Sequence, residues 1–336
     1  MTVLSVLDLS PVPEGSSAGD ALRNSAGLAR HVEALGYRRF WMAEHHNMPG
    51  IASAATAVAL AHVATHTSSI RLGAGGIMLP NHAPLIIAEQ FGTLAALHPG
   101  RIDLGLGRAP GTDQNTMRAL RRNLGTGPDE FPRDVVELME YFKPAAPGQA
   151  IQAVPGAGLE MEFWILGSST YGAQLAAMLG LPYAFASHFA PQQMMEAIAV
   201  YRERFRPVGE LQKPHVMLGC GVFAADTDAE ARLLFSSQQQ AFVNLRTGRP
   251  GKLPRPVEGY EESLDPYAQR VLSGSLSCSF VGSRETVRRQ LAEFIARTGA
   301  DELMVTAQIH DPEARKRSFT MLAEVHAEMD AVPAGA

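Results

Sequence analysis

The amino-acid sequence predicts an α/β fold, a (β/α)8 TIM barrel with loop insertions, formed as a single domain by residues 1–336. Strand-like and helix-like segments alternate along most of the chain, and eight of the strand-like segments are short and apolar. Polar side chains directly follow several of these strands, as they do at the mouth of such a barrel. A chain of 336 residues, 46% hydrophobic and 19% charged, is long enough for one domain of this kind.

The first half of the chain contains four strand and helix units. Apolar residues recur at helical spacing over residues 22–35 and again over residues 135–142. Two further helices are predicted to begin near Ser53 and Pro84, and the second of them stops at residues 98–100, where the sequence is His-Pro-Gly. The predicted strands are residues 3–7, a segment from residue 39 that ends at His45, residues 70–79 and residues 102–107.

The second half repeats the same alternation. Residues 144–158 are rich in Pro and Gly and are predicted to form a connection on the barrel rim. Thr227 and Glu230 have the spacing of a capping box, which supports a helix from residue 228. The remaining strands are predicted at residues 163–166, 183–186, 216–223 and 302–306, and the helices at residues 172–179, 191–205, 228–244 and 285–296.

A long connection precedes the last predicted unit. Residues 247–267 are rich in Pro and Gly and exceed the length of an ordinary barrel loop. Segments of this length are usually active-site lids or disordered. We expect residues 247–267 to form either a lid that covers the substrate or a mobile insertion, and both interpretations stay open.

Composition and charge disfavour several classes of function. The formal net charge of -5 argues against a broad nucleic-acid or anionic-membrane surface. Cys220 and Cys278 are far apart, so the sequence predicts no disulfide scaffold and no thiolate metal site, and a reducing cytoplasmic location is expected. Residues 1–8 lack a basic region and are predicted to form a strand rather than a signal peptide. No segment reaches the roughly 20 apolar residues that a spanning helix needs.

The most informative motif is a short apolar strand that ends in Glu44, His45 and His46. Adjacent residues on a strand point in opposite directions, so only one of the two histidines can readily face the barrel mouth. This argues against a metal site that uses both, and we predict none. A buried histidine that bonds to backbone is the structural alternative. The other conceivable ligands have no characteristic spacing; they are Asp8, Asp103 and His188.

Small residues end two other strands. Residues 73–80 end the third strand, and the first four of them have almost no side chain. We therefore expect a flat ligand, an unusual peptide geometry or a bulge there. Arg108 directly follows the fourth strand and offers a planar fork of donors to an anion. Ser168 and Ser169 lie where a strand enters a helix, a geometry that holds phosphate, although ordinary N-capping by Ser169 or Thr170 explains the pattern equally well. Together these patterns suggest a phosphorylated planar cofactor.

These motifs in this order resemble the bacterial luciferase-like family of flavin-dependent monooxygenases over nearly the whole chain. The most specific pieces are residues 41–46, 73–84, 99–108 and 299–305. The resemblance implies a (β/α)8 barrel that uses FMN, with the reduced form as cosubstrate.

The resemblance also implies roles for individual residues. It places the catalytic histidine on His45, beside Glu44, which we include as a catalytic candidate. It places a cis peptide bond beside the flavin ring between Gly75 and Gly76. The predicted cofactor-binding residues are Met42, Gly75, Gly76, Arg108, Ser168, Ser169, Tyr171 and Gly172.

Two positions differ from luciferase itself. Gly107 replaces the cysteine near the reactive edge of the flavin, and Ser187 replaces the tryptophan after the sixth strand. Light emission and use of long-chain aldehydes are therefore not predicted. The glycines after Leu104 do not have Rossmann spacing, so reduced FMN is expected from a separate flavin reductase. The resemblance further implies a homodimer.

The implied activity is oxygenation of a small organic substrate by reduced FMN and O2 through a C4a-peroxyflavin, with His45 as acid or base. Three alternatives stay open: a hydride-transfer enzyme that uses deazaflavin (F420), a non-catalytic flavin-binding protein, and a metal-dependent barrel hydrolase. The substrate itself is not predicted, because it depends on the loops 11–17, 47–52 and 247–267.

Overall fold

Eight parallel strands close into a barrel in the computed structural model, which describes residues 2–109, 114–120 and 130–331. The pairings of β6 with β7, of β7 with β9 and of β9 with β1 complete the ring. The predicted (β/α)8 barrel is therefore confirmed. In order around the ring the strands are β1 (Val3–Asp8), β2 (Arg39–Met42), β3 (Arg71–Met78), β4 (Ile102–Gly107), β5 (Glu162–Gly167), β6 (Tyr183–Phe185), β7 (Val216–Ala224) and β9 (Glu302–Thr306).

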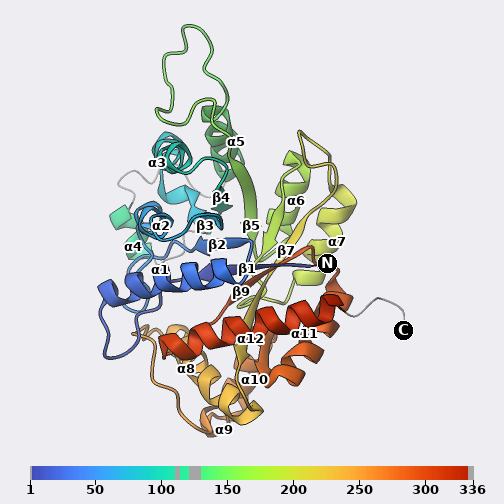
Figure 1. Ribbon diagram of the computed structural model, residues 1–336. Helices are drawn as coiled ribbons and strands as arrows, with labels where there is room; N and C mark the ends of the chain where they lie inside the picture. The colour runs from blue at the N-terminus through green and yellow to red at the C-terminus, as the bar shows by residue number, and fades with distance from the viewer. Residues whose placement is uncertain (1, 110–113, 121–129, 332–336) are drawn as a thin grey trace.

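Helices surround the barrel and connect its strands (Figure 1). Their apolar faces cover the outer side of the sheet in one large buried cluster that includes Phe40, Leu72 and Leu104. The helical elements are α1 (Ala18–Ala34), α2 (Thr56–Ala64), η1 (Leu79–Asn81), α3 (Pro84–Leu97), α4 (Gln114–Leu120), α5 (Phe131–Tyr141), α6 (Thr170–Leu179), α7 (Met194–Arg204), α8 (Asp228–Arg246), α9 (Tyr260–Ser263), α10 (Pro266–Ser275), α11 (Arg284–Thr298) and α12 (Pro312–Ala331).

The structure adds elements that the sequence does not predict. β8 (Ser279–Gly282) pairs with the end of β7 outside the ring, and its four residues are too few to show a strand pattern. α12 follows the last barrel strand and packs against α1 and α11. The strand predicted to end at His45 ends at Met42, where its pairing with β1 and β3 stops.

Two tryptophans fill the barrel interior. Trp41 and Trp164 are buried, and their ring centroids are 5.3 Å apart in a T-shaped arrangement. A Cβ at Gly73 would lie only 2.6 Å from Nε1 of Trp41. Glycine at position 73 therefore leaves space for the Trp41 side chain, so the small residues of β3 are explained in part by packing within the protein and not by a ligand alone.

Buried ion pairs close the amino-terminal end of the barrel. Arg39, at the start of β2, bonds to Asp103 at 2.8 Å, to Glu162 at 2.9 Å and to Glu302 at 3.0 Å. Arg71 bonds to the same Asp103 and Glu162. Asp103, one of the conceivable metal ligands, is thus an ion-pair partner at the end of the barrel opposite its mouth.

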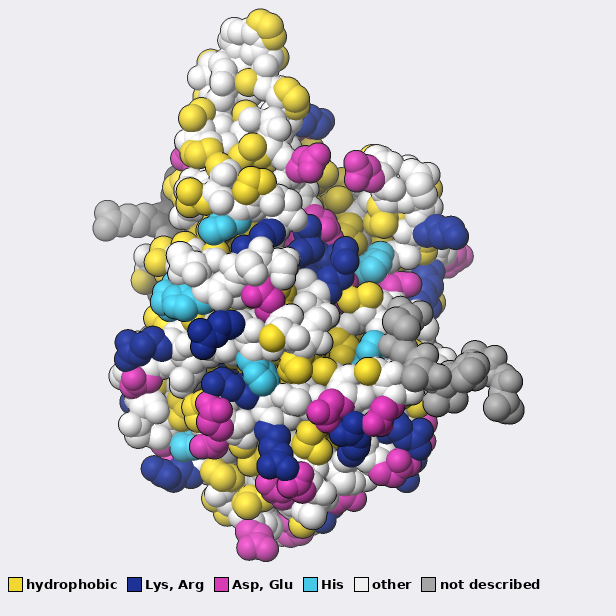
Figure 2. Space-filling view, in the orientation of Figure 1, with side chains coloured by type: hydrophobic (Ala, Val, Ile, Leu, Met, Phe, Trp, Pro, Cys, Tyr) yellow, Lys and Arg dark blue, Asp and Glu magenta, His cyan; other side chains and the backbone are white. Residues whose placement is uncertain are grey.

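The surface shows a mixed distribution of charge. On the face seen in Figure 2, acidic and basic side chains are interspersed over the lower part of the molecule. Residues 144–158, between α5 and β5, project from the body and contain no charged side chain (Figures 1 and 2). Among the helices that the structure describes, none has the length and hydropathy needed to cross a membrane.

Candidate functional site

A cavity of about 630 Å³ lies at the carboxyl-terminal mouth of the barrel. Its floor is apolar and includes Leu7, Trp41, Leu166, Met217 and Met304. Seven of the eight predicted cofactor residues line it, together with His45: Gly75, Gly76, Arg108, Ser168, Ser169, Tyr171 and Gly172. The ends of several strands therefore bring these distant segments of the sequence together, as expected for this fold.

Two imidazoles lie in the cavity wall, His45 after β2 and His188 after β6. The Nδ1 atom of each is buried and has no hydrogen-bond partner within the described part of the chain. Burial lowers the pKa of His45, and burial with the neighbouring His45 lowers the pKa of His188 to about 4. Both rings are neutral at pH 7, so each can donate one hydrogen bond and accept another.

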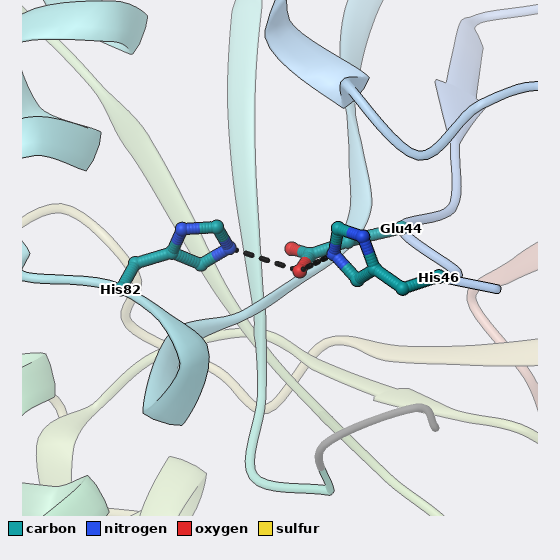
Figure 3. A group of neighbouring side chains, drawn as sticks. All are labelled: Glu44, His46 and His82. Atoms are coloured by element: carbon teal, nitrogen blue, oxygen red, sulfur yellow. Dashed lines mark hydrogen bonds and ion pairs between the residues drawn. The ribbon is translucent and has the colours of Figure 1, made fainter. Parts of the chain in front are cut away.

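Glu44 lies behind the cavity wall rather than in it. Its carboxylate accepts hydrogen bonds from Nε2 of His46 at 2.7 Å and of His82 at 2.9 Å (Figure 3), and from the Met78 N–H at 2.9 Å. Burial alone would raise the pKa of Glu44, but these donors lower it overall. Glu44 thereby joins the loop after β2 to the end of β3. Of the two adjacent histidines, His45 lines the cavity and His46 bonds to Glu44 behind its wall, although both lie beyond the end of β2.

The group Glu44, His46 and His82 also gathers three potential metal-ligand atoms within 4.8 Å, in the part of the chain that the structure describes. The nitrogen–oxygen distances of 2.7 and 2.9 Å are ordinary hydrogen-bond lengths. Ligand atoms of a tetrahedral zinc, each about 2.0 Å from the metal, would lie roughly 3.3 Å apart. The arrangement is that of a carboxylate with two donors, and we assign no metal to it.

The backbone of Gly75 and Gly76 forms a part of the wall without side chains. The peptide bond between them is cis, and the pairing of β3 with β4 shifts register at this point. A Cβ at Gly76 would lie 2.7 Å from the carbonyl oxygen of Gly105. The Glu44 N–H donates to the Gly76 carbonyl at 3.3 Å. The unusual peptide geometry and the bulge expected from the sequence are thus both present.

The residues predicted to bind a phosphate lie together on the β4 and β5 side of the cavity. The guanidinium carbon of Arg108 is 4.0 Å from the centroid of the Tyr171 ring. Ser169 is the N-cap residue of α6, but its side chain makes no capping bond, so ordinary capping does not use its hydroxyl. Ser168 and Gly172 complete this part of the wall. A guanidinium, unused hydroxyls and the amino terminus of α6 together favour a bound anion.

Met42 is the predicted cofactor residue that lies away from the cavity. Side chains alternate along β2, so Trp41 and Ala43 face the interior and Met42 faces the surrounding helices. It is fully buried in the core between barrel and helices. The assignment of Met42 to the cofactor site is therefore corrected.

The predicted site lacks five polar residues of the wall, and three of them, His188, Gln238 and Thr306, share one feature; the other two are Arg246 and Gln308. Each of the three has a buried polar atom that no described residue satisfies, namely Nδ1, Oε1 and Oγ1. His188 and Thr306 lie at or just beyond strand ends, a position that is itself a usable signal. Gln238 lies within α8, and no sequence pattern places a helix interior over the mouth.

The carboxyl-terminal half of α8 and the segment after it cover the mouth. Pro250, Gly251 and Leu253 line the cavity. The Leu253 N–H donates to the Val12 carbonyl and the Glu14 N–H donates to the Leu253 carbonyl, both at 2.9 Å. Residues 247–267, for which we expect either a lid or a mobile insertion, are thus in contact with the loop after β1. Both interpretations stay predictions.

Comparisons with known proteins agree with this architecture. Residues 2–302 match the family model described as luciferase-like monooxygenase. A luciferase-like monooxygenase of Escherichia coli K12 is 52% identical over 325 residues, which cover 97% of each chain. An N-acetyl-S-alkylcysteine monooxygenase of Bacillus subtilis is 32% identical over 333 residues, 96% of this chain and 98% of the relative.

Solved structures show the same fold. Apo-MsnO8 has a TM-score of 0.86 and 35% identity and covers 97% of this chain and 99% of its own. Fold alone is shared with an FMN complex of the oxygenating constituent of 3,6-diketocamphane monooxygenase from Pseudomonas putida, with 18% identity, a TM-score of 0.71 and coverage of 96% and 97%. The same holds for an F420-dependent secondary alcohol dehydrogenase, with 15% identity, a TM-score of 0.68 and coverage of 96% and 98%. The family match and the 52% identity carry the assignment: the chain belongs to the luciferase-like monooxygenase family.

Proposed function

We propose that this protein is a flavin-dependent monooxygenase that uses reduced FMN and O2 to oxygenate a small organic substrate. The observation that supports this most is one cavity that combines the residues predicted to bind a phosphate, around Arg108, with a neutral imidazole at His45. Reduced FMN, when bound, would supply the electrons that activate O2. Oxygenation is also the reaction named for the N-acetyl-S-alkylcysteine monooxygenase relative.

The residues present fit the cofactor. Arg108, Ser168, Ser169 and the first turn of α6 would hold the phosphate, because they offer positive charge and donors that no described residue uses. The wall without side chains at Gly75–Gly76 would accept the flat ring. A deazaflavin also has a phosphate and a flat ring, so binding has to be measured for both cofactors.

His45 would move a proton at the reacting atoms. Its pKa is lowered by burial, so the ring is neutral at pH 7 and can accept a proton there. The apolar floor of the cavity would exclude water from the reaction and so suppress loss of the oxidant as hydrogen peroxide.

Three features of the proposal concern partners and location. A separate flavin reductase would supply reduced FMN. A homodimer would form through barrel helices such as α2, on which Val58 is 72% exposed. Cys220 and Cys278 are free and buried, which suits a reducing cytoplasm.

The test begins with anaerobic protein that holds reduced FMN, mixed with oxygenated buffer in a stopped-flow spectrometer. We expect the protein to delay both the return of oxidised FMN and the release of hydrogen peroxide by roughly tenfold relative to free reduced FMN. Tight binding of F420 with no binding of reduced FMN would overturn the proposal, as would substrate turnover that needs no O2.

Two variants assign roles within the site. Arg108→Gln should weaken FMN binding about tenfold but leave riboflavin binding unchanged, because riboflavin has no phosphate. His45→Asn should retain FMN and slow oxygen transfer about a hundredfold. His98→Asn, at the carboxyl-terminal end of the outer helix α3, is the matched control. Equal losses of FMN and riboflavin affinity in Arg108→Gln would contradict the phosphate role.

A further inference from the structure

One face of α8 borders the cavity and is not used by the proposed cofactor site. Gln238, Ala241, Phe242 and Leu245 follow the i, i+3, i+4, i+7 spacing of a single helix face, and all of them line the cavity. This face follows β7, which neighbours β9 in the ring, and β9 is the strand opposite β4. Two strands, β5 and β6, separate β7 from β4 in the ring, so this face borders a different part of the mouth from the end of β4 that carries Arg108.

A hydrogen-bonding group on this face lacks a partner. Gln238 is only 7% exposed, and its Oε1 is buried with no partner in the described residues. The next two glutamines differ, because Gln239 donates to Glu261 at 2.7 Å and Gln240 donates to the Arg255 carbonyl at 2.8 Å. Since an unpaired buried polar atom costs free energy, a group supplied by a ligand is the simplest partner for Gln238.

Arg246 adds a cation to the same face. Its guanidinium carbon is 5.2 Å from the centroid of the Phe242 ring, so the side chain runs back one turn toward Gln238. Of the described residues that line the cavity, Arg108 and Arg246 are the two with a formal charge, and none is Asp, Glu or Lys. With Arg108 assigned to the cofactor phosphate, Arg246 is left for a second anion.

We infer that this face recognises the substrate as an apolar organic acid that also bears an amide. Arg246 pairs with the carboxylate, Gln238 accepts the amide N–H, and Phe242, Leu245 and Leu253 contact the apolar part. An N-acylated apolar amino acid has all three groups. The inference rests on the proposed function for the role of this molecule as substrate, whereas its binding requires neither O2 nor turnover.

Equilibrium binding to the FMN-loaded protein tests the inference with three matched probes. N-acetyl-L-leucine has the acid and the amide, N-acetyl-L-leucinamide lacks the charge, and 4-methylpentanoate lacks the acetamido group. We expect N-acetyl-L-leucine to bind about tenfold more tightly than either of the other two, the effect of one hydrogen bond to a charged or buried group.

Variants identify the residues responsible. Arg246→Gln should abolish the preference for the acid over the leucinamide, and Arg246→Lys should retain it. Gln238→Leu should abolish the preference for N-acetyl-L-leucine over 4-methylpentanoate. Arg232→Gln, on the same helix but outside the cavity wall, is the matched control.

The outcomes separate this inference from the proposed function. If the wild-type protein delays peroxide release but shows no preference among the three probes, the proposed function stands and the inference fails. If the preferences and their loss in the variants are observed without any oxygen chemistry, the binding face stands and the monooxygenase proposal fails. Loss of FMN affinity in Arg246→Gln would also overturn the inference, because it would place Arg246 in the cofactor site.

Discussion

At the scale of single residues, His45 and His188 are kept neutral by burial instead of by a fixed partner. Their Nδ1 atoms are unsatisfied within the described chain, and each ring borders the cavity. A Cβ at position 219 would collide with the His188 ring, so Gly219 is required for this imidazole to lie against β7. The absence of a side chain at Gly219 therefore makes room for the His188 ring in the barrel mouth.

The low pKa of His188 predicts a dependence of stability on pH. The folded-state pKa is about 4, whereas an unperturbed histidine has a pKa of about 6.5. Between these values the unfolded chain binds a proton that the folded chain does not. The free energy of unfolding should therefore be undiminished above pH 6.5 and should decrease as the pH falls toward 4, by about 2 kcal/mol at pH 5 from this residue alone.

Urea unfolding at pH 7.5 and pH 5 measures this effect. His188→Asn cannot titrate, so the variant should lose about 2 kcal/mol less than the wild type between these two pH values. His31→Asn, on the outer helix α1, controls for the removal of a histidine. The same pH dependence in wild type and His188→Asn would show that His188 is readily protonated in the folded protein.

At the scale of single elements, the glycines of β3 and β4 make close packing possible. A Cβ at Gly105 would collide with the Ala74 carbonyl and lie 2.7 Å from Cδ1 of Leu166. Gly105→Ala should thus lower the free energy of unfolding by about 2–3 kcal/mol. Gly27→Ala, in α1 with no atom near the added Cβ, should raise it by about 0.5–1 kcal/mol. Equal effects of the two substitutions on urea unfolding would contradict this account.

The strands and helices differ in how far their positions can be predicted from the sequence. The barrel strands were predictable because they are short apolar runs followed by Gly, Pro or polar residues. Motifs at the strand ends also indicated that His45 and Arg108 lie at the same mouth, and both line the cavity. β8 was not predictable, because its pairing outside the ring is a tertiary contact. Gln238 was missed for a similar reason: the helix pattern of α8 indicates a buried face but not what that face covers.

At the scale of the whole molecule, the two ends of the barrel differ: one holds a group of ion pairs and the other holds the cavity. The amino-terminal end holds Arg39 among three carboxylates, and the carboxyl-terminal end holds the cavity. Arg39→Met would leave Asp103 and Glu302 buried with too little positive charge, so the free energy of unfolding should fall by about 3–5 kcal/mol.

FMN affinity should not change in the same variant, because Arg39 and the cavity lie at opposite ends of the barrel. Urea unfolding and a flavin fluorescence titration measure the two properties on one sample. Arg23→Met, which breaks an exposed ion pair with Asp20, should leave both nearly unchanged. Weaker FMN binding by folded Arg39→Met would show that the two ends are coupled.

β7 pairs with three strands: with β6 and β9 inside the ring, and with β8 outside it. Residues 225–278 connect β7 to β8, two strands that are adjacent and hydrogen-bonded to each other. This stretch includes the face of α8 that borders the cavity. None of the strand pairings of the ring includes a residue of this stretch, so a change in its length or sequence leaves each of those pairings between the same residues. A change of substrate during evolution would then require substitutions in residues 225–278 and no change in the strand pairing of the barrel.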